Sequence, residues 1–262
     1  MEVIITTDEE IGLRAARIVA DVVRARGPRA VLGVATGSSP LTTYAELARM
    51  VAAGELDFSH ASAFALDEYG GLGPDDPRSY AATIREEVTV PLGFDPERVH
   101  VPDGAAADLF VAAEEYDVAI REAGGVDVQL LGVGTNGHIG FNEPTSSLAS
   151  RTRVKVLTEQ TRLDNSRFFD HLDDVPTLCL TQGLGTIMEA RSVVVLATGE
   201  SKAEAIAGIV EGPVTAMCPG SILQWHPRTT VIVDEAAASR LRNVDYYRYV
   251  QQQLDRMRAE RP

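Results

Sequence analysis

The stretch AVLGVATGSSPL, residues 30–41, decides the fold. An apolar run over residues 30–34 ends in the loop ATGSSP, residues 35–40, and a helical pattern starts near Leu41. A strand that passes through a glycine- and serine-containing loop into a helix is typical of open α/β folds with a parallel sheet. Ligands bind beyond the carboxyl ends of such strands, so the residues that follow each strand are the candidate site residues.

Outward from this stretch, short runs rich in Val, Ile and Leu recur along the chain, with helical patterns between most of them. The runs cover residues 61–66, 126–133, 192–197 and 229–233. This alternation predicts a parallel sheet with helices on both faces, in one α/β domain over residues 1–262. A capping-box pattern, TDEE at residues 7–10, predicts the start of the first helix.

The overall charge argues against some classes of partner. The chain has 24 Lys and Arg against 38 Asp and Glu, a formal net charge of -14, so nucleic acid or an anionic membrane would be repelled. Cys179 and Cys218 have neither CxxC spacing nor a nearby histidine cluster, which argues against a zinc site or a disulfide framework. No apolar run nears the ~18 residues of a membrane span, and no basic leader precedes the first strand. We therefore expect a cytoplasmic protein.

Residues 158–181 differ in kind from the rest of the chain. They hold several charges, the pair Phe168-Phe169 and the polar pair Asp173-Asp174 before Pro176. This composition fits a mobile lid that closes over a site. It fits an ordinary surface helix and loop equally well, and the sequence leaves both interpretations open.

The loop at residues 35–40 has the features of an anion site. Glycine lets the backbone approach a ligand closely, hydroxyl groups add donors, and the following helix N-terminus adds free amides and a positive dipole end. The loop lacks the Walker lysine and the dinucleotide spacing, so a nucleotide is not indicated. Lys202, which opens the helix after the run at 192–197, is a candidate cation. The alternatives are a plain turn with an N-cap serine and a solvated lysine.

Two carboxylates follow the run at residues 61–66. Asp67 and Glu68 stand directly after Leu66 and therefore at the carboxyl end of a predicted strand. A carboxylate in this place can take a proton from carbon if it is partly desolvated and close to the substrate. The alternative is an aspartate that caps the next turn.

The stretch GVGTNGHIGFNEP, residues 132–144, carries the strongest signal. Four glycines surround His138, with Asn136 two residues before it and Glu143 five residues after it. Histidine side chains titrate near neutral pH, so an imidazole oriented by a carboxylate can protonate and deprotonate a sugar ring oxygen. A histidine that only satisfies a tight turn would account for neither the flanking polar residues nor the glycines.

These stretches resemble the glucosamine-6-phosphate deaminase family, and the likeness spans essentially the whole chain. The matching motifs, in order, are TGSSP (36–40), LDEY (66–69), GHIGFNEP (137–144), SSLASRTR (146–153), TR (161–162), NSR (165–167) and SKA (201–203). The resemblance implies a modified Rossmann-like, doubly wound α/β fold with a mostly parallel sheet. It also implies conversion of glucosamine 6-phosphate and water into fructose 6-phosphate and ammonia, with no metal or organic cofactor.

The resemblance further implies a role for each candidate residue. His138 would open the pyranose ring as an acid-base catalyst, and Glu143 would orient it. Asp67 would remove the C2 proton to give an enolamine and return a proton to C1. The residues implied in phosphate binding are Thr36, Gly37, Ser38, Ser39, Arg167 in the lid and Lys202.

One position departs from the pattern of many family members. They carry Asp where this chain has Asn136, in the carboxylate group around the histidine. An amide cannot accept with a full charge, so the imidazolium form gains less stabilisation than from two carboxylates. We expect activity to be retained.

A possible regulatory site is implied as well. The residues that resemble the activator site for N-acetylglucosamine 6-phosphate, at the subunit contacts of hexameric members, are Ser146, Arg153, Lys155 and Tyr246. Arg153 and Lys155 are alternate residues of a strand-like run, so both point to one face, where a phosphate could bind. A solvated strand edge is the alternative.

Two other functions compete with this interpretation. The first is a 6-phosphogluconolactonase, which has a related fold, phosphate loop and Gly-His element. Ester hydrolysis needs no base over C2, so the motifs LDEY and FNEP argue against it. The second is a non-catalytic sugar-phosphate sensor. The sequence has neither a basic stripe nor a DNA-binding helix pair that would support this function.

Overall fold

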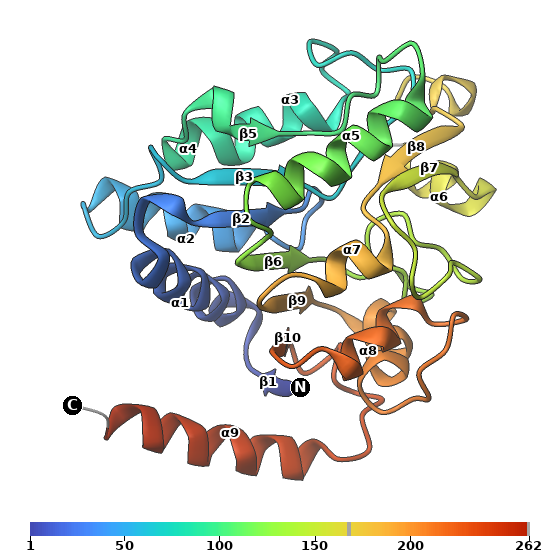
Figure 1. Cartoon of the computed structure of the whole chain (residues 1–262). Coiled ribbons are helices and arrows are strands. Elements are labelled where there is room, and N and C mark those ends of the chain that lie inside the picture. Colours follow the sequence, from blue (N-terminus) through green and yellow to red (C-terminus); the bar gives the residue numbers. More distant parts are fainter. Residues whose placement is uncertain (167–168, 261–262) are drawn as a thin grey trace.

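The computed structural model describes residues 1–166 and 169–260. Within them, a seven-stranded sheet has the order β1-β10-β9-β6-β2-β3-β5, and its neighbouring strands pair in parallel (Figure 1). The strands are β1 (Glu2–Ile5), β2 (Val31–Val34), β3 (Ser62–Ala65), β5 (Val99–His100), β6 (Val128–Leu131), β9 (Val193–Ala197) and β10 (Thr229–Val233). The prediction of a doubly wound, mostly parallel α/β fold is confirmed.

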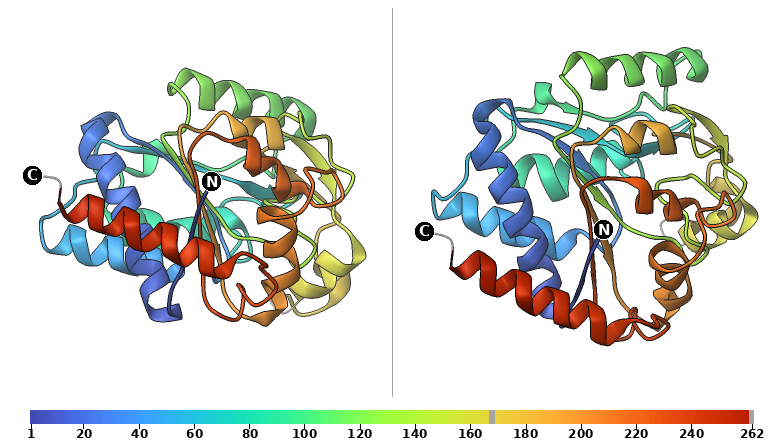
Figure 2. Two further views of the ribbon diagram at one scale, coloured as in Figure 1. Left: turned by 90° about the horizontal axis from the view of Figure 1, so that it is seen from below. Right: turned by 60° about the horizontal axis from the view of Figure 1, so that its bottom comes forward.

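Helices cover both faces of this sheet, because its strand residues are apolar on both sides. Val31 of β2 faces a core with α5, α7 and α8, whereas Leu32 faces a core with α1, α2 and α3. Figure 2 shows the two groups of helices on either side of the sheet, with α9 at the β1 end. The helices are α1 (Asp8–Arg26), α2 (Leu41–Ala52), α3 (Tyr80–Ile84), α4 (Val90–Leu92), α5 (Leu109–Glu122), α6 (Glu159–Asn165), α7 (Leu184–Met188), α8 (Ala203–Val210) and α9 (Val244–Ala259).

Short helical turns join several of these elements. They are η1 (Gly27–Arg29), η2 (Arg85–Thr89), η3 (Pro96–Arg98), η5 (Leu172–Asp174), η6 (Glu200–Lys202) and η7 (Pro219–Trp225). The predicted capping box at α1 does not form, because the side chain of Thr7 makes no cap hydrogen bond. Thr6 donates to Glu10 instead, at 2.5 Å. In the described residues, no helix is long and apolar enough to cross a membrane.

The strand order reverses between β2 and β6. From β2 the chain adds β3 and β5 on one side, and it then returns to add β6, β9 and β10 on the other. Loops diverge at such a switch point and leave room for a ligand. The loops after β2 and β6 meet there, since a β-carbon on Gly132 would lie 3.7 Å from Oγ of Ser39.

A second, three-stranded antiparallel sheet was not predicted. It has the order β4-β8-β7, with β4 (Asp67–Tyr69), β7 (Arg153–Val156) and β8 (Leu178–Thr181). Leu66 alone separates β3 from β4, so the chain passes from the large sheet into the small one at Asp67. Asp67 pairs with Thr181, and the segment from 158 to 181 therefore ends in a fixed strand of this sheet.

Candidate active site

A tight turn after β6 presents His138. The N–H of Gly134 donates to the carbonyl of His138 at 2.9 Å, and the N–H of Gly137 donates to the carbonyl of Gly134 at 3.0 Å. A β-carbon on Gly134 would lie 2.2 Å from Cε1 of His138, so the imidazole rests directly on glycine backbone. The side chain of His138 remains 23% exposed, which keeps it accessible to a ligand.

Glu143 holds the imidazole from one side. Nδ1 of His138 lies 3.3 Å from Oε2 of Glu143, the distance of an ion pair rather than of an aligned hydrogen bond. The amide of Asn136 donates to the same Oε2 at 2.8 Å, and Oδ1 of Asn136 accepts from the backbone N–H of His138 at 3.1 Å. Thr161 on α6 donates to Oε1 at 2.5 Å.

These contacts set the charge state of Glu143. Burial by itself would raise its pKa, but the neighbouring His138 and the hydrogen bonds from Thr161 and Asn136 outweigh burial and lower the pKa to about 2. Glu143 is therefore a carboxylate at any pH near neutrality. The predicted group of Asn136, His138 and Glu143 lies together, and Thr161 is a member that sequence reasoning missed.

Asp67 is a carboxyl group in the opposite situation. It is 7% exposed, and no described residue donates a hydrogen bond to its side chain. Burial, and secondly the nearby charge of Glu68, raises the pKa of Asp67 to about 8. A carboxyl with such a pKa is a stronger base than an ordinary aspartate when it is ionised.

The turn that carries His138 also reaches Asp67. A β-carbon on Gly140 would lie 3.5 Å from Oδ2 of Asp67 and 2.9 Å from Oγ1 of Thr181. Gly140 has a φ of 56°, a left-handed conformation that favours glycine. The turn that carries His138 therefore lies directly against Asp67.

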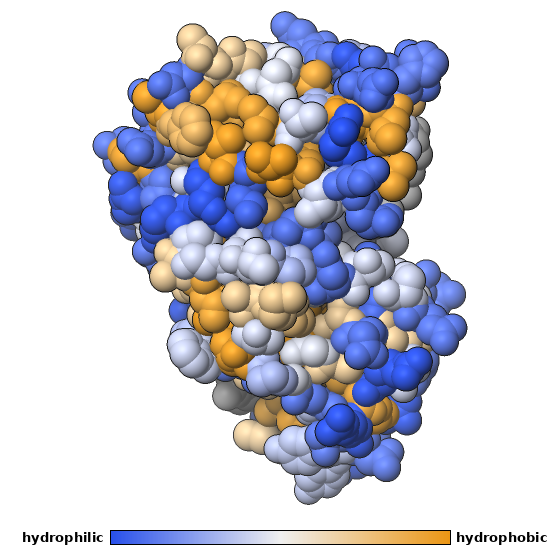
Figure 3. Space-filling model, turned by 90° about the vertical axis from the view of Figure 1, so that its right-hand side faces the viewer, coloured by the Kyte–Doolittle hydropathy of each residue, from blue (hydrophilic) through white to orange (hydrophobic). Residues whose placement is uncertain are grey.

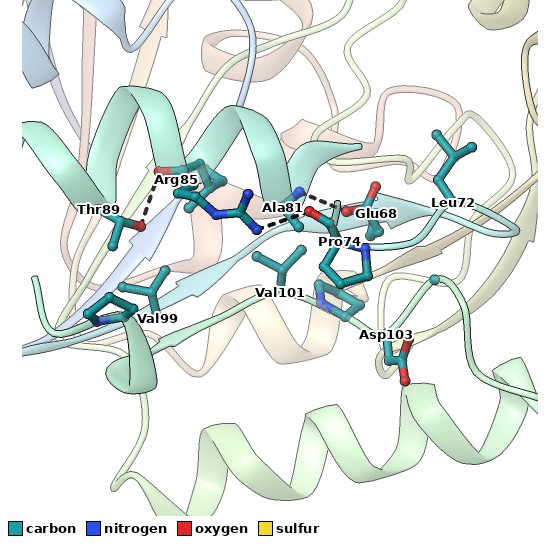
Figure 4. Close-up of a pocket in the computed structure, with 13 residues that line it drawn as sticks. Glu68, Leu72, Pro74, Ala81, Arg85, Thr89, Val99, Val101 and Asp103 are labelled. Atoms are coloured by element: carbon teal, nitrogen blue, oxygen red, sulfur yellow. Dashed lines mark hydrogen bonds between the residues drawn. The ribbon is translucent and has the colours of Figure 1, made fainter. Parts of the chain in front are cut away.

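Glu68 faces away from this space. It is 2% exposed and accepts hydrogen bonds from the backbone N–H groups of Tyr69, Tyr80 and Ala81, so it ties β4 to the start of α3. Glu68 lines a separate cavity of about 330 Å³ together with Arg85 and other residues of the β5 side (Figure 4). None of the predicted site residues within the described chain lines this cavity.

The predicted phosphate loop is anchored at its first residue and exposed at its centre. Tyr44 accepts from the N–H of Ala35 at 3.0 Å and donates to the carbonyl of the same residue at 2.8 Å. Gly37 has a φ of 92° and is exposed together with Ser38. The N-cap of α2 is Pro40, which has no side-chain cap hydrogen bond, so the alternative of an N-cap serine is wrong.

Lys202 ends η6, directly after β9, and β9 lies beside β6 in the sheet. Its loop therefore opens at the same edge as the other two loops. Arg167 lies outside the described residues. In the part of the chain that the structure describes, no group of three His, Cys, Asp or Glu side chains could hold a metal ion.

The predicted activator residues do not converge within one copy of the chain. Arg153 and Lys155 lie on β7, and Nη1 of Arg153 donates to Oδ1 of Asn142 at 2.9 Å. Ser146 is buried, and its hydroxyl has no partner among the described residues. Tyr246 lies on α9, which packs along β1 away from β7 (Figure 1).

The described part of the predicted lid contacts the site. Besides the bond from Thr161 to Glu143, the ring of Phe169 packs edge-on against Tyr69 with centroids 5.7 Å apart. The guanidinium of Arg78 lies 5.4 Å from the centroid of the Phe169 ring. On the face of the molecule in Figure 3, apolar side chains gather into patches, the broadest of them in the upper half, with hydrophilic side chains around them.

Comparison with known proteins decides the family. The family described as glucosamine-6-phosphate isomerases/6-phosphogluconolactonase matches residues 8–232. The chain belongs to this family. It is 61% identical to the glucosamine-6-phosphate deaminase of Cutibacterium acnes, over 97% of each chain. It is 57% identical to that of Streptomyces coelicolor, over 95% of this chain and 96% of the relative.

Solved structures of the glucosamine-6-phosphate isomerase/6-phosphogluconolactonase family agree with the fold. A monomeric glucosamine-6-phosphate deaminase superposes with a TM-score of 0.89 at 41% identity, covering 92% of this chain and all 100% of that one. The 6-phosphogluconolactonase from Trypanosoma cruzi superposes with a TM-score of 0.74 at 19% identity, covering 92% of this chain and 97% of that one. The second likeness shows the fold alone.

Proposed function

We propose that this protein converts glucosamine 6-phosphate and water into fructose 6-phosphate and ammonia. The observation that carries the proposal is the pair His138 and Asp67, an imidazole held by a carboxylate and a desolvated carboxyl, with Gly140 of the His138 turn next to the carboxyl. The identity to several glucosamine-6-phosphate deaminases over nearly the full length supports the same reaction.

The reaction needs one proton relay at oxygen and one at carbon. His138 takes the proton of the C1 hydroxyl and delivers one to the ring oxygen, which opens the pyranose to the aldehyde. Glu143 stabilises the imidazolium that forms between these transfers. Ionised Asp67 removes the proton from C2 while the substrate ammonium group gives up a proton that goes to the aldehyde oxygen, which yields the neutral enolamine. Asp67 then returns its proton to C1, which leaves an iminium at C2. Water adds to the iminium carbon, and ammonia leaves.

A protonated substrate amine would lower the pKa of Asp67. A cation close to a carboxyl lowers its pKa, so binding the aminosugar favours the ionised form of Asp67, whose pKa is about 8 without substrate.

The phosphate would be held by the backbone and hydroxyls of residues 36–39 and by Lys202, with Arg167 closing over it from the lid. The lid would move over residues 158–177 only, because β8 is fixed in the small sheet.

Regulation and assembly remain part of the proposal. An activator site made of Ser146, Arg153, Lys155 and Tyr246 needs a second copy of the chain, because the four do not converge in one. The solved deaminase at 41% identity is described as monomeric, and hyperbolic kinetics in a monomer would argue against the activator site.

A cytoplasmic location agrees with the unpaired state of Cys179 and Cys218.

Release of ammonia tests the main proposal. Purified protein is given glucosamine 6-phosphate or 6-phosphogluconolactone, with coupled assays for ammonia and for lactone hydrolysis. Glucosamine 6-phosphate deuterated at C2 should react measurably more slowly where proton removal by Asp67 limits turnover. Lactone hydrolysis without ammonia would favour the lactonase, and binding without turnover would favour a sensor.

A further inference from the structure

Asn142 is fully buried and uses each of its side-chain hydrogen-bonding groups. Its amide donates to the carbonyl of Ile139 at 2.9 Å and to the carbonyl of Gln182 at 2.8 Å. Its Oδ1 accepts from Nη1 of Arg153 at 2.9 Å. The charged donor fixes which way the amide points, because reversing it would set two N–H groups against a guanidinium.

The two carbonyls belong to the two halves of the site. Ile139 follows His138 in the turn after β6. Gln182 follows β8, and its backbone N–H donates to the carbonyl of Leu66 at 2.8 Å while its Nε2 donates to the carbonyl of Ala65 at 3.0 Å. Leu66 directly precedes Asp67. A chain of hydrogen bonds therefore runs from the turn with His138 through Asn142 and Gln182 to the backbone next to Asp67.

We propose that Asn142 is a positioning residue that sets the separation of His138 and Asp67, with Arg153 orienting its amide. The inference rests on the proposed function, because it assigns Asn142 to the same two-residue chemistry. A misplacement of about 1 Å between reacting groups can cost about 100-fold in rate. The hydrogen bonds of the Asn142 side chain go to Ile139, Gln182 and Arg153 and not to the loops at residues 36–39 and Lys202, so substrate affinity should depend on it much less than turnover does.

The hydrogen bonds that hold this turn in place also keep water away from Asp67. Phe141 donates its N–H to Oγ1 of Thr181 at 3.1 Å, and Gly140 lies against Oδ2 of Asp67. Loosening the turn hydrates this carboxyl and brings its pKa back toward the ordinary value. Besides His138 of the same site, the titratable groups whose charge interacts with that of Asp67 are Glu68, Tyr69, Tyr80, Tyr116 and Cys179. Burial raises the pKa of the tyrosines and the thiol, so they carry no charge near neutral pH.

The test is Asn142→Asp, which keeps the side-chain shape and the acceptor for Arg153. It replaces both donors by an oxygen that faces two carbonyls. We expect kcat for ammonia release to fall about 100-fold with KM within about threefold. The pH profile of kcat/KM should differ from that of the wild type, because water reaches Asp67 and a second carboxylate stands near it.

Asp127→Asn is the matched control for lost stability. Asp127 is 2% exposed, accepts from the N–H of Val31 and pairs with Arg26 and Arg191 at the amino end of the sheet. Its variant should melt at a lower temperature while kcat and the pH profile stay as in the wild type. A fall in kcat and a shifted profile in Asn142→Asp alone support the positioning role.

If Asn142→Asp does not fold, Arg153→Met decides the same question, measured without any sugar-phosphate activator. It removes the donor that orients the amide, and we expect the same change of profile with a smaller loss of kcat, about tenfold. A folded variant with unchanged kcat and an unchanged pH profile overturns the inference. Absence of ammonia from the wild type would instead overturn the proposed function.

Discussion

Replacing Asp67 by Asn should abolish turnover and stabilise the protein, two effects with one physical cause. The carboxyl is 7% exposed and receives no hydrogen bond from the described residues. The folded protein therefore disfavours its ionised form, which the reaction requires as the base. An amide has the shape of the neutral carboxylic acid and cannot ionise, so Asp67→Asn removes both the base and the buried charge.

The size of the stabilisation follows from the pKa of Asp67. Folding raises it from 3.8 to about 8, and at 1.36 kcal/mol per unit this shift corresponds to about 6 kcal/mol at most. Relaxation and water penetration reduce such penalties, and we expect about 2 to 3 kcal/mol at pH 8. For a chain of this size, this corresponds to a rise in Tm of about 5 to 10 °C.

The dependence on pH distinguishes this cause from a general gain in packing. Because the folded-state pKa lies above the unfolded value, the unfolded chain releases its proton first as pH rises. The stability that protonated Asp67 contributes is fully present below about pH 4 and is lost progressively up to about pH 8. The advantage of Asp67→Asn should therefore grow between these values and level off above them.

Thermal melting of wild type and Asp67→Asn at pH 5, 6, 7 and 8 measures this difference, with ammonia release assayed in parallel. Glu143→Gln is the matched control of opposite sign, because the pKa of Glu143 is lowered to about 2 by its donors. It should destabilise the protein near neutrality and lower kcat about 100-fold. An Asp67→Asn variant that melts below the wild type at pH 8, or that retains turnover, would refute the reasoning.

Three further variants probe the surroundings of the two groups. Asn136→Asp places a second carboxylate next to Glu143, where a 2.8 Å hydrogen bond now joins Asn136 to Glu143. The pH profile of kcat/KM should move to higher pH, with turnover within about tenfold of the wild type. An unchanged profile would mean that residue 136 does not affect the protonation of His138. Gly134→Ala places a β-carbon 2.2 Å from the His138 ring, so kcat should fall at least about tenfold; wild-type kinetics would mean that the ring sits elsewhere. Phe169→Ala removes a ring contact worth about 1 kcal/mol and should raise KM about fivefold, whereas an equal rise in a Leu163→Ala control would show a general disturbance of the segment.

The large sheet was predictable because its strands are buried on both faces. Runs such as residues 193–197 are apolar at every position, and apolar runs of this length between helical patterns are typical of the central strands of a parallel sheet. The small sheet gave no comparable signal. Its strand β4 has three residues and begins with two carboxylates, and its partner β8 lies more than a hundred residues further along the chain. A strand this short shows no periodicity, so only tertiary contacts reveal it.

The site was predictable to the level of its loops. Strand ends mark the carboxyl edge of a parallel sheet, and this rule alone selected residues 35–40, Asp67 and the turn with His138. It did not select Thr161, whose hydroxyl reaches Glu143 from α6, because that contact depends on how the segment after β7 folds back. Nor could it assign Asn136 both as donor to Glu143 and as acceptor from the His138 backbone.

The two buried carboxyls show how one site can carry out both proton transfers. Asp67 and Glu143 are 7% and 5% exposed, so both lose most of their hydration. Glu143 recovers that loss through Thr161, Asn136 and the adjacent imidazole and stays ionised. Asp67 receives no hydrogen bond from the residues that the structure describes, and it binds its proton up to about pH 8. When the surroundings shift the pKa values of two acids in opposite directions, one acid can serve as a permanently charged partner and the other as a base. The division of roles therefore depends on the hydrogen-bond donors that surround each carboxyl rather than on how deeply it is buried.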